Sequence, residues 1–122
     1  MFESLDVPVF CDADVVIAGA GPAGIGAAIA SAMQGRKTVL LEQTGSAGGM
    51  STNSLIPIIL HQGDGKRVVV GNICHSIVRD ACAEMGIHEV HPLWQPVDTE
   101  VLKRVCDRRL LEAGVKVFYM IR

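Results

Sequence analysis

The sequence has little excess charge of either sign. Its 122 residues include 11 Lys and Arg and 13 Asp and Glu, which give a formal net charge of −2. Proteins that bind nucleic acid through the phosphate backbone carry a basic excess gathered in a patch or stripe, and no basic run occurs here. We therefore expect no nucleic-acid partner.

Closely spaced cysteines are also missing. The four cysteines are Cys11, Cys74, Cys82 and Cys106, and no two of them form a CxxC pair. Structural zinc sites and iron–sulfur clusters need closely spaced cysteines, so we expect no metal site from these four residues. Reduced thiols in a cytoplasmic protein are the simplest interpretation.

The first residues lack the basic segment with which a signal peptide begins. The chain starts at Met1 and carries Glu3 and Asp6 before any Lys or Arg. This is the wrong charge for the first segment of a secretion signal. We expect no targeting segment and a cytoplasmic location.

Leu and Phe are absent from an uncharged run near the start of the chain. Residues 15–33 hold no charge over 19 positions, which is long enough for a membrane span. The run contains four glycines and Pro22, and Asp12 and Asp14 precede it where a span is usually flanked by Lys or Arg. Because Ala and Gly bury too little apolar area to favour insertion strongly, we expect no membrane span.

Length and composition favour one domain. A chain of 122 residues can bury a core but is short for a cofactor domain together with a substrate domain. The hydrophobic fraction of 49% and the charged fraction of 20% are typical of a buried α/β core. We expect an α/β fold.

The uncharged run divides at its glycines into two elements. The β-branched residues 15–17 predict a strand buried on both faces, and the Ala-rich residues 22–33 predict a helix. Pro22 suits the first helical turn and Gly35 the position after the helix. Residues 37–41 then predict a second strand, so the order is strand, glycine turn, helix, strand.

The junction has the spacing of a dinucleotide-binding turn. Gly19, Gly21 and Gly24 form a GxGxxG motif between a strand and a helix. Gly19 would permit a tight turn, Gly21 would leave room for a pyrophosphate, and Gly24 would allow the helix to pack closely. Glu42, 23 positions after Gly19, could accept hydrogen bonds from a ribose and would repel the 2′-phosphate of NADP. The alternative is a purely structural turn with a solvated Glu42.

A glycine pair, Gly48 and Gly49, follows Glu42 by six residues. With it, the segment "DVVIAGAGPAGIGAAIASAMQGRKTVLLEQTGSAGGMSTN" resembles the N-terminal FAD-binding segment of FAD-dependent oxidoreductases of the glutathione-reductase-like superfamily, nearest to the group of the heterodisulfide reductase flavoprotein subunit. The resemblance implies a Rossmann-like FAD/NAD(P)-binding βαβ fold with a parallel sheet, and FAD as the cofactor. The cofactor-binding residues that it implies are Gly19, Gly21, Pro22, Ala23, Gly24, Glu42, Gln43, Gly48, Gly49, Met50 and Ser51, with Thr52 following toward the flavin ring.

The second half of the chain is consistent with this family. Apolar residues at helical spacing predict helices that end near Gly86 and Gly114, the first with Asn72 as a candidate N-cap and the second with Asp98 or Thr99. Cys82 and Cys106 fall on the apolar faces of these helices, so we expect both in the core. Residues 115–121 predict a third parallel strand that runs to the last residue, Arg122.

Other polar residues of this half favour ordinary loops. His88 and His91 do not have the HExxH spacing of a zinc site, and Pro92 makes a helix there unfavourable. Asp64 with Gly65 indicates a hairpin turn between apolar runs, and Pro57 indicates an edge strand or an irregular arm. We expect neither a metal site nor a second phosphate loop in this region.

The resemblance implies a longer enzyme. Relatives continue for several hundred residues with a substrate domain and a C-terminal FAD segment, so residues 1–122 would be the N-terminal FAD-binding portion of an incomplete domain. Iron–sulfur clusters occur in some relatives, but the cysteines here do not support one. The leading hypothesis is the FAD-binding portion of a flavin-dependent oxidoreductase, whose remainder could be a separate chain and whose electron donor or acceptor is unknown. An NAD-dependent dehydrogenase domain and a non-catalytic nucleotide-binding module are the alternatives. No catalytic acid, base or cysteine is assigned.

Overall fold

The computed structural model describes residues 7–121. In chain order the elements are β1 (Val15–Ala18), α1 (Pro22–Met33), β2 (Thr38–Leu41), the short 3-10 helix η1 (Gly49–Ser51), β3 (Ile58–Leu60), α2 (Asn72–Glu84), β4 (Trp94–Pro96), α3 (Thr99–Glu112) and β5 (Lys116–Phe118). The acidic pattern at Glu3 and Asp6 and the terminal Arg122, both used in the sequence predictions, lie outside the described residues.

The main sheet has three parallel strands. Its order is β1-β2-β5, with Val16 opposite Val39 and Val39 opposite Lys116. The predicted βαβ unit is therefore confirmed, and the third parallel strand lies beside β2. Strands β3 and β4 form a separate antiparallel pair.

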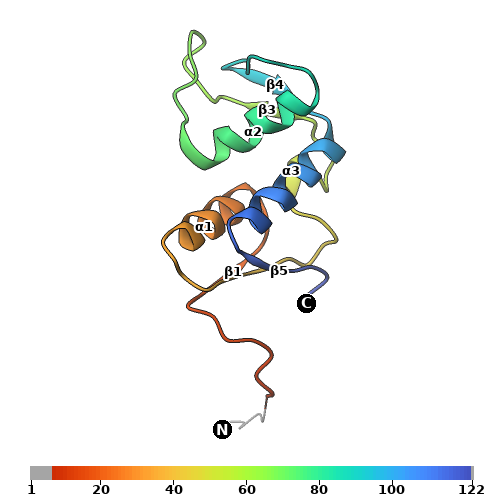
Figure 1. Ribbon diagram of the computed structural model, residues 1–122. Coiled ribbons are helices and arrows are strands. Elements are labelled where there is room, and N and C mark those ends of the chain that lie inside the picture. Colours follow the sequence, from red (N-terminus) through yellow and green to blue (C-terminus); the bar gives the residue numbers. More distant parts are fainter. Residues whose placement is uncertain (1–6, 122) are drawn as a thin grey trace, which may run out of the picture.

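Helices cover one face of the main sheet. Helices α1 and α3 pack directly on the strands, while α2 packs on those two helices and lies farther from the sheet, next to β3 and β4 (Figure 1). Ile17 and Val117 pack against the core cluster that contains Leu40. Cys82 and Cys106 are both buried in it, at 0% and 2% exposure, as the helical spacing predicted.

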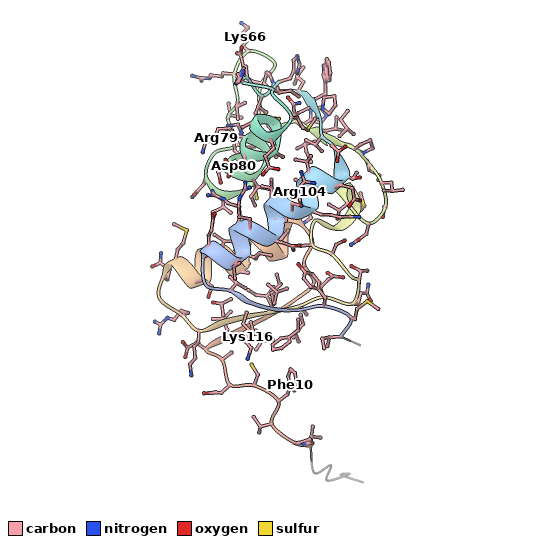
Figure 2. All side chains as sticks on the ribbon, turned by 45° about the vertical axis from the view of Figure 1, so that its right-hand side comes forward. Phe10, Lys66, Arg79, Asp80, Arg104 and Lys116 are labelled. Carbon is pink, nitrogen blue, oxygen red and sulfur yellow. The ribbon has the colours of Figure 1, made fainter. Side chains whose placement is uncertain are left out.

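The opposite face of the sheet is only partly covered. The prediction that the first strand is buried on both faces is wrong, because Val16 is 60% exposed. Within residues 7–121 no helix packs on this side. The ring of Phe10 contacts the ring of Phe118 there edge to face, with 5.0 Å between the two ring centroids. Figure 2 shows Phe10 and Lys116 on this side of the sheet. β-branched residues are typical both of strands covered on one face and of strands covered on two faces, so the composition of β1 could not show which applies here.

The uncharged run of residues 15–33 becomes a strand, a turn and a helix of 12 residues. Pro22 is the first residue of α1, as predicted, and Gly35 has a φ of 76° just beyond its end. No helix within residues 7–121 is long and apolar enough to cross a membrane.

The ends of the other two helices confirm most of the predicted signals. Gly86 and Gly114 follow the C-cap residues of α2 and α3 and have φ values of 76° and 81°. The Asp98 carboxylate caps α3 by accepting from the backbone N–H groups of Glu100 and Val101. The N-cap predicted at Asn72 is wrong: Gly71 is the N-cap of α2, and Asn72 is its first helical residue with a φ of 68°.

Two strand predictions change in extent or partner. The third strand is shorter than predicted, because pairing with β2 ends at Phe118 and the backbone turns at Met120, whose φ is 60°. The Asp64 turn forms, with its carboxylate accepting from the N–H groups of Lys66 and Arg67. The hairpin expected around that turn does not extend beyond one bridge, because β3 pairs with β4 instead. Among residues 7–121, β4 is the only strand that pairs with β3, in line with the edge position indicated by Pro57.

Candidate functional site

The turn between β1 and α1 is built on two glycines that other residues could not replace. Gly19 has a φ of 98°, a left-handed conformation that lets the chain leave the strand sharply. A Cβ on Gly24 would lie 1.8 Å from the carbonyl oxygen of Gly19. The first turn of α1 can therefore approach the end of β1 only because residue 24 is a glycine.

Gly21 lies between these two and faces open space. Its backbone is extended, with φ −72° and ψ 177°, and a Cβ built on it would have no heavy atom within 4 Å. Neither the fold nor backbone strain therefore requires glycine here. The space in front of Gly21 is the kind of opening that a ligand approaching the backbone would use.

The N-terminus of α1 presents unpaired backbone N–H groups at this turn. Pro22 has no N–H, and the N–H groups of Ala23 and Gly24 lie in the first turn, where a helix supplies no acceptor. The N-cap Gly21 has no side chain to cap them, and the first turn contains no acidic residue that would compete with an anion. The partial positive charge of a helix of 12 residues adds to these donors.

The second glycine pair packs against the first turn. The Gly48 N–H donates to the carbonyl oxygen of Ala20 at 2.8 Å, and Gly48 and Gly49 both have left-handed φ values, 110° and 61°. A Cβ on Gly49 would lie 3.0 Å from the Cα of Gly21 and 3.3 Å from the Cδ of Pro22. Two segments separated in sequence thus pack against each other, and we call them together the glycine cradle (residues 19–24 and 48–51).

Glu42 connects the first half of the cradle, at Ala20, to the loop that begins at Thr44. Its carboxylate is 7% exposed; Oε2 accepts from the Ala20 N–H at 2.7 Å, and Oε1 accepts from the N–H and the hydroxyl of Thr44, both at 2.7 Å. Burial opposes ionisation, but the hydrogen bonds from Thr44 and Ala20 outweigh it and keep the pKa of the carboxyl below its usual value. The alternative of a solvated Glu42 is therefore wrong, since the side chain is buried and anionic.

The remaining predicted residues divide into exposed and buried ones. Ala23, Gln43 and Met50 are exposed, and Ser51 is half-buried at the edge of the cradle. Thr52, which was expected to continue toward a flavin, is instead fully buried, and its hydroxyl donates to the carbonyl oxygen of Ala47. Its methyl group would lie 2.3 Å from a Cβ on Gly48, so it supports the loop from behind.

The cysteines and histidines do not form a metal centre. Within the part of the chain that the structure describes, no three His, Cys, Asp or Glu side chains are grouped as metal ligands. The His91 ring stacks against Trp94 and its Nδ1 accepts from two backbone N–H groups of the same loop. Burial raises the pKa of the Cys106 thiol to about 12, with smaller contributions from Asp107 and Cys74.

Two residues of this region escaped the sequence predictions. Thr44, which donates twice to Glu42, carried no signal because a Thr in a loop is common. Gln62 is 5% exposed, and its side-chain nitrogen has no hydrogen-bond partner. Its position two residues after the apolar β3 was the only hint that a polar side chain would be buried.

Comparison with known protein families decides the family. The family model described as FAD dependent oxidoreductase matches residues 14–122, which include all of the glycine cradle and Glu42. The chain belongs to this family. Among curated proteins, none matches the chain.

Several solved structures have a fold similar to that of this member of the FAD-dependent oxidoreductase family. THI4 from Thermovibrio ammonificans superposes with a TM-score of 0.55 and 24% identity over 88% of this chain and 38% of that one. The anhydrotetracycline hydroxylase OxyS from Streptomyces rimosus gives a TM-score of 0.54 and 19% identity over 88% of this chain and 24% of that one. At these identities the likeness shows the fold. The chain spans well under half the length of both structures.

Proposed function

We propose that this chain binds FAD and is the FAD-binding portion of a flavin-dependent oxidoreductase. The observation that carries the proposal is the packing of the second glycine loop on the first, with Gly49 against Gly21, around unpaired helical N–H groups. When bound, the flavin would supply the redox chemistry, and this chain would position and orient it.

The pyrophosphate is assigned to the N-terminus of α1. Gly19, Gly21 and Gly24 shape the turn, Pro22 begins the helix, and the Ala23 and Gly24 N–H groups are the donors. The fit is supported by the empty space at Gly21, which a side chain would fill. A dianionic group gains from helix dipole and backbone donors without a cationic side chain.

The adenosine ribose is assigned to Glu42, with Gln43 beside it. The Oε2 atom of Glu42 accepts one hydrogen bond, from Ala20, and a carboxylate oxygen has two acceptor positions. The second position would take a ribose hydroxyl, and the anionic state favoured by the lowered pKa suits an acceptor. Gly48, Gly49, Met50 and Ser51 would then line the path from the pyrophosphate toward the flavin ring.

FAD is favoured over NAD by the family match and by the Gly48–Gly49 loop, which adds a second wall to the cradle. The NAD-dependent dehydrogenase domain remains the alternative. Among FAD-dependent oxidoreductases, we place the chain nearest to the group of the heterodisulfide reductase flavoprotein subunit, and in the cytoplasm. The electron donor or acceptor and the rest of the enzyme would be supplied by further chain or by a separate subunit.

The test uses two glycines with matching structural roles. Gly21 and Gly71 are both helix N-caps with extended backbones and no neighbour within 4 Å of a Cβ. Valine can be accommodated at both sites, so Gly21→Val and Gly71→Val should leave the fold intact, as judged by circular dichroism. Bound FAD would be measured by quenching of its fluorescence.

We expect Gly21→Val to weaken FAD binding and Gly71→Val to leave it unchanged. Hydrogen bonds to a charged group contribute about 1.5–3 kcal/mol each, so losing two would weaken binding on the order of 100-fold or more. Equal FAD affinity in both variants would show that the pyrophosphate does not lie at Gly21. Absence of FAD binding to the unmodified chain would overturn the proposal itself.

A further inference from the structure

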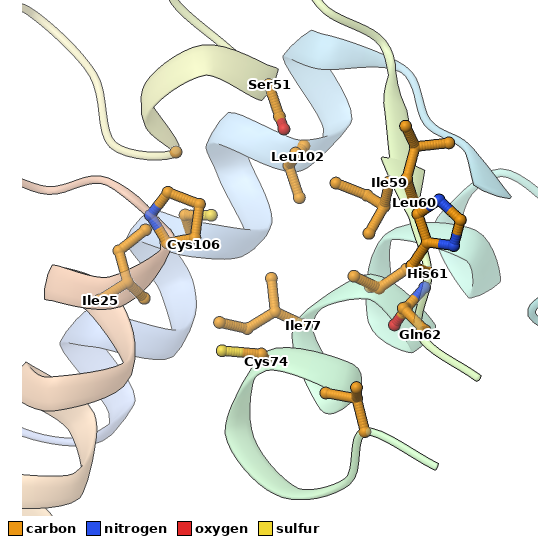
Figure 3. A pocket seen from close by; sticks show the side chains of 14 residues that line it. Ile25, Ser51, Ile59, Leu60, His61, Gln62, Cys74, Ile77, Leu102 and Cys106 are labelled. Atoms are coloured by element: carbon orange, nitrogen blue, oxygen red, sulfur yellow. The ribbon is translucent and has the colours of Figure 1, made fainter. Parts of the chain in front are cut away.

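A cavity of about 240 Å³ opens beside the glycine cradle. Pro22 and Ser51 of the cradle line it, and Ile59, Ile77 and Leu102 contribute apolar side chains from β3, α2 and α3 (Figure 3). Among the described residues, no Asp, Glu, Lys or Arg side chain lines it. Small-molecule pockets usually measure about 300–1,000 Å³, so this cavity suits a compound of one or two rings.

One polar side chain in this wall is left without a full set of partners. Gln62 lines the cavity and is 5% exposed. Its Oε1 lies 3.3 Å from His75 Nδ1, whereas its Nε2 has no hydrogen-bond partner. Burying an amide N–H group without an acceptor costs about 1–3 kcal/mol, and such groups are rare in folded proteins. An acceptor supplied by a ligand would remove that cost.

The backbone next to Gln62 is also unusual. His61, which also lines the cavity, has a φ of 54°, a left-handed conformation that residues other than glycine rarely adopt. It is held by a hydrogen bond from its N–H to the Leu93 carbonyl oxygen. Strained residues of this kind cluster at ligand sites, where the surrounding structure maintains them.

From this geometry we propose that the cavity is a second ligand site, which takes an uncharged, mainly apolar ring compound carrying a carbonyl group. The apolar walls bind the ring, the absence of Asp, Glu, Lys and Arg side chains from the lining disfavours a charged ligand, and the Gln62 Nε2 N–H group donates to the carbonyl oxygen. Because the cavity shares Pro22, Gly48 and Ser51 with the cradle, such a ligand would lie beside a bound dinucleotide. The binding itself does not require the dinucleotide.

The experiment compares two bicyclic probes that differ in one group. 1-Tetralone carries a ring carbonyl, and tetralin has the same rings without it. Each is titrated into the ¹⁵N-labelled chain in the absence of FAD, and the side-chain amide signal of Gln62 is followed by NMR. We expect 1-tetralone to shift that signal and to bind about tenfold more tightly than tetralin, as one hydrogen bond to a buried donor would give.

Three variants locate the site. Gln62→Leu should reduce 1-tetralone to the affinity of tetralin. Gln95→Leu is the matched control, because Gln95 is equally buried but both ends of its amide are already hydrogen-bonded away from the cavity. Cys74→Trp, at an exposed position on the cavity wall, should abolish binding of both probes by filling the space.

The outcomes against the proposal are distinct. Equal affinity for the two probes, or an unchanged preference in Gln62→Leu, would show that the amide does not select a carbonyl. Loss of 1-tetralone binding at saturating FAD would show that the cavity belongs to the FAD site. A chain that binds no FAD but still binds 1-tetralone through Gln62 would refute the proposed function and leave this inference standing.

Discussion

The close approach of α1 to the end of β1 gives a quantitative prediction at Gly24. A Cβ at this position would lie 1.8 Å from the Gly19 carbonyl oxygen and 3.0 Å from its carbonyl carbon, and both are backbone atoms. A flexible side chain could move aside, but here the helix or the turn must shift. Overpacking of this kind typically costs about 1–3 kcal/mol, and so short a contact belongs at the upper end of that range.

Gly26, two residues after Gly24 in the same helix, is the matched control. A Cβ there would lie 3.6 Å from Cys74 Sγ, an ordinary contact. Replacing a helical Gly with Ala raises helix stability by about 0.5–1 kcal/mol, and this gain applies at both positions. We therefore expect Gly26→Ala to raise the free energy of unfolding by about 0.5–1 kcal/mol and Gly24→Ala to lower it by about 2 kcal/mol.

The difference between the two variants is about 3 kcal/mol, or roughly 10 °C in Tm for a domain of this size. It would be measured by urea and thermal unfolding followed by circular dichroism at 222 nm. Equal stability of the two variants would refute the reasoning, because it would mean that α1 does not press against Gly19 in solution.

Three further predictions concern other contacts. Because the pKa of Glu42 is lowered in the fold, its ionised form stabilises the protein above the usual carboxyl pKa of 4.5, and this effect is lost as pH falls through the lower folded pKa. Glu42→Gln should therefore lower Tm at pH 7 and lower it much less at pH 3. A decrease in Tm that does not depend on pH would contradict this prediction. Asp98→Ala should cost about 1 kcal/mol in urea unfolding through loss of the α3 cap, with Glu100→Ala as a smaller comparison. Cys106, 2% exposed and with its pKa raised to about 12, should resist iodoacetamide at pH 8 while the exposed Cys74 reacts; equal labelling by mass spectrometry would show that the core opens.

The parts of the fold that depend on neighbouring residues were predictable from the sequence. The glycine turn, the start of α1 at Pro22, the Asp98 cap and the ends at Gly86 and Gly114 each follow from a local backbone requirement. The periodic apolar faces of α2 and α3 likewise placed Cys82 and Cys106 in the core.

The parts that depend on distant residues were not predictable in this way. Exposure of Val16 depends on which layer covers the sheet, and the pairing of β3 with β4 joins residues more than 30 positions apart. The same holds for the candidate site. The motif spacing indicated Gly21 and Glu42, but only the packed structure places Gly49 against Gly21 and leaves Gln62 Nε2 without a partner.

The choice between FAD and NAD is tested most directly by a competition titration on the unmodified chain. FAD is bound at a fixed concentration, and its displacement by NAD, by ADP and by FMN is followed through flavin fluorescence. If the cradle holds the pyrophosphate and Glu42 the adenosine ribose, ADP and NAD, which carry both groups, should displace FAD, NAD only at concentrations above the FAD dissociation constant, while FMN, which lacks the adenosine half, should compete weakly. A dissociation constant for NAD below that of FAD would contradict the assignment and identify an NAD site.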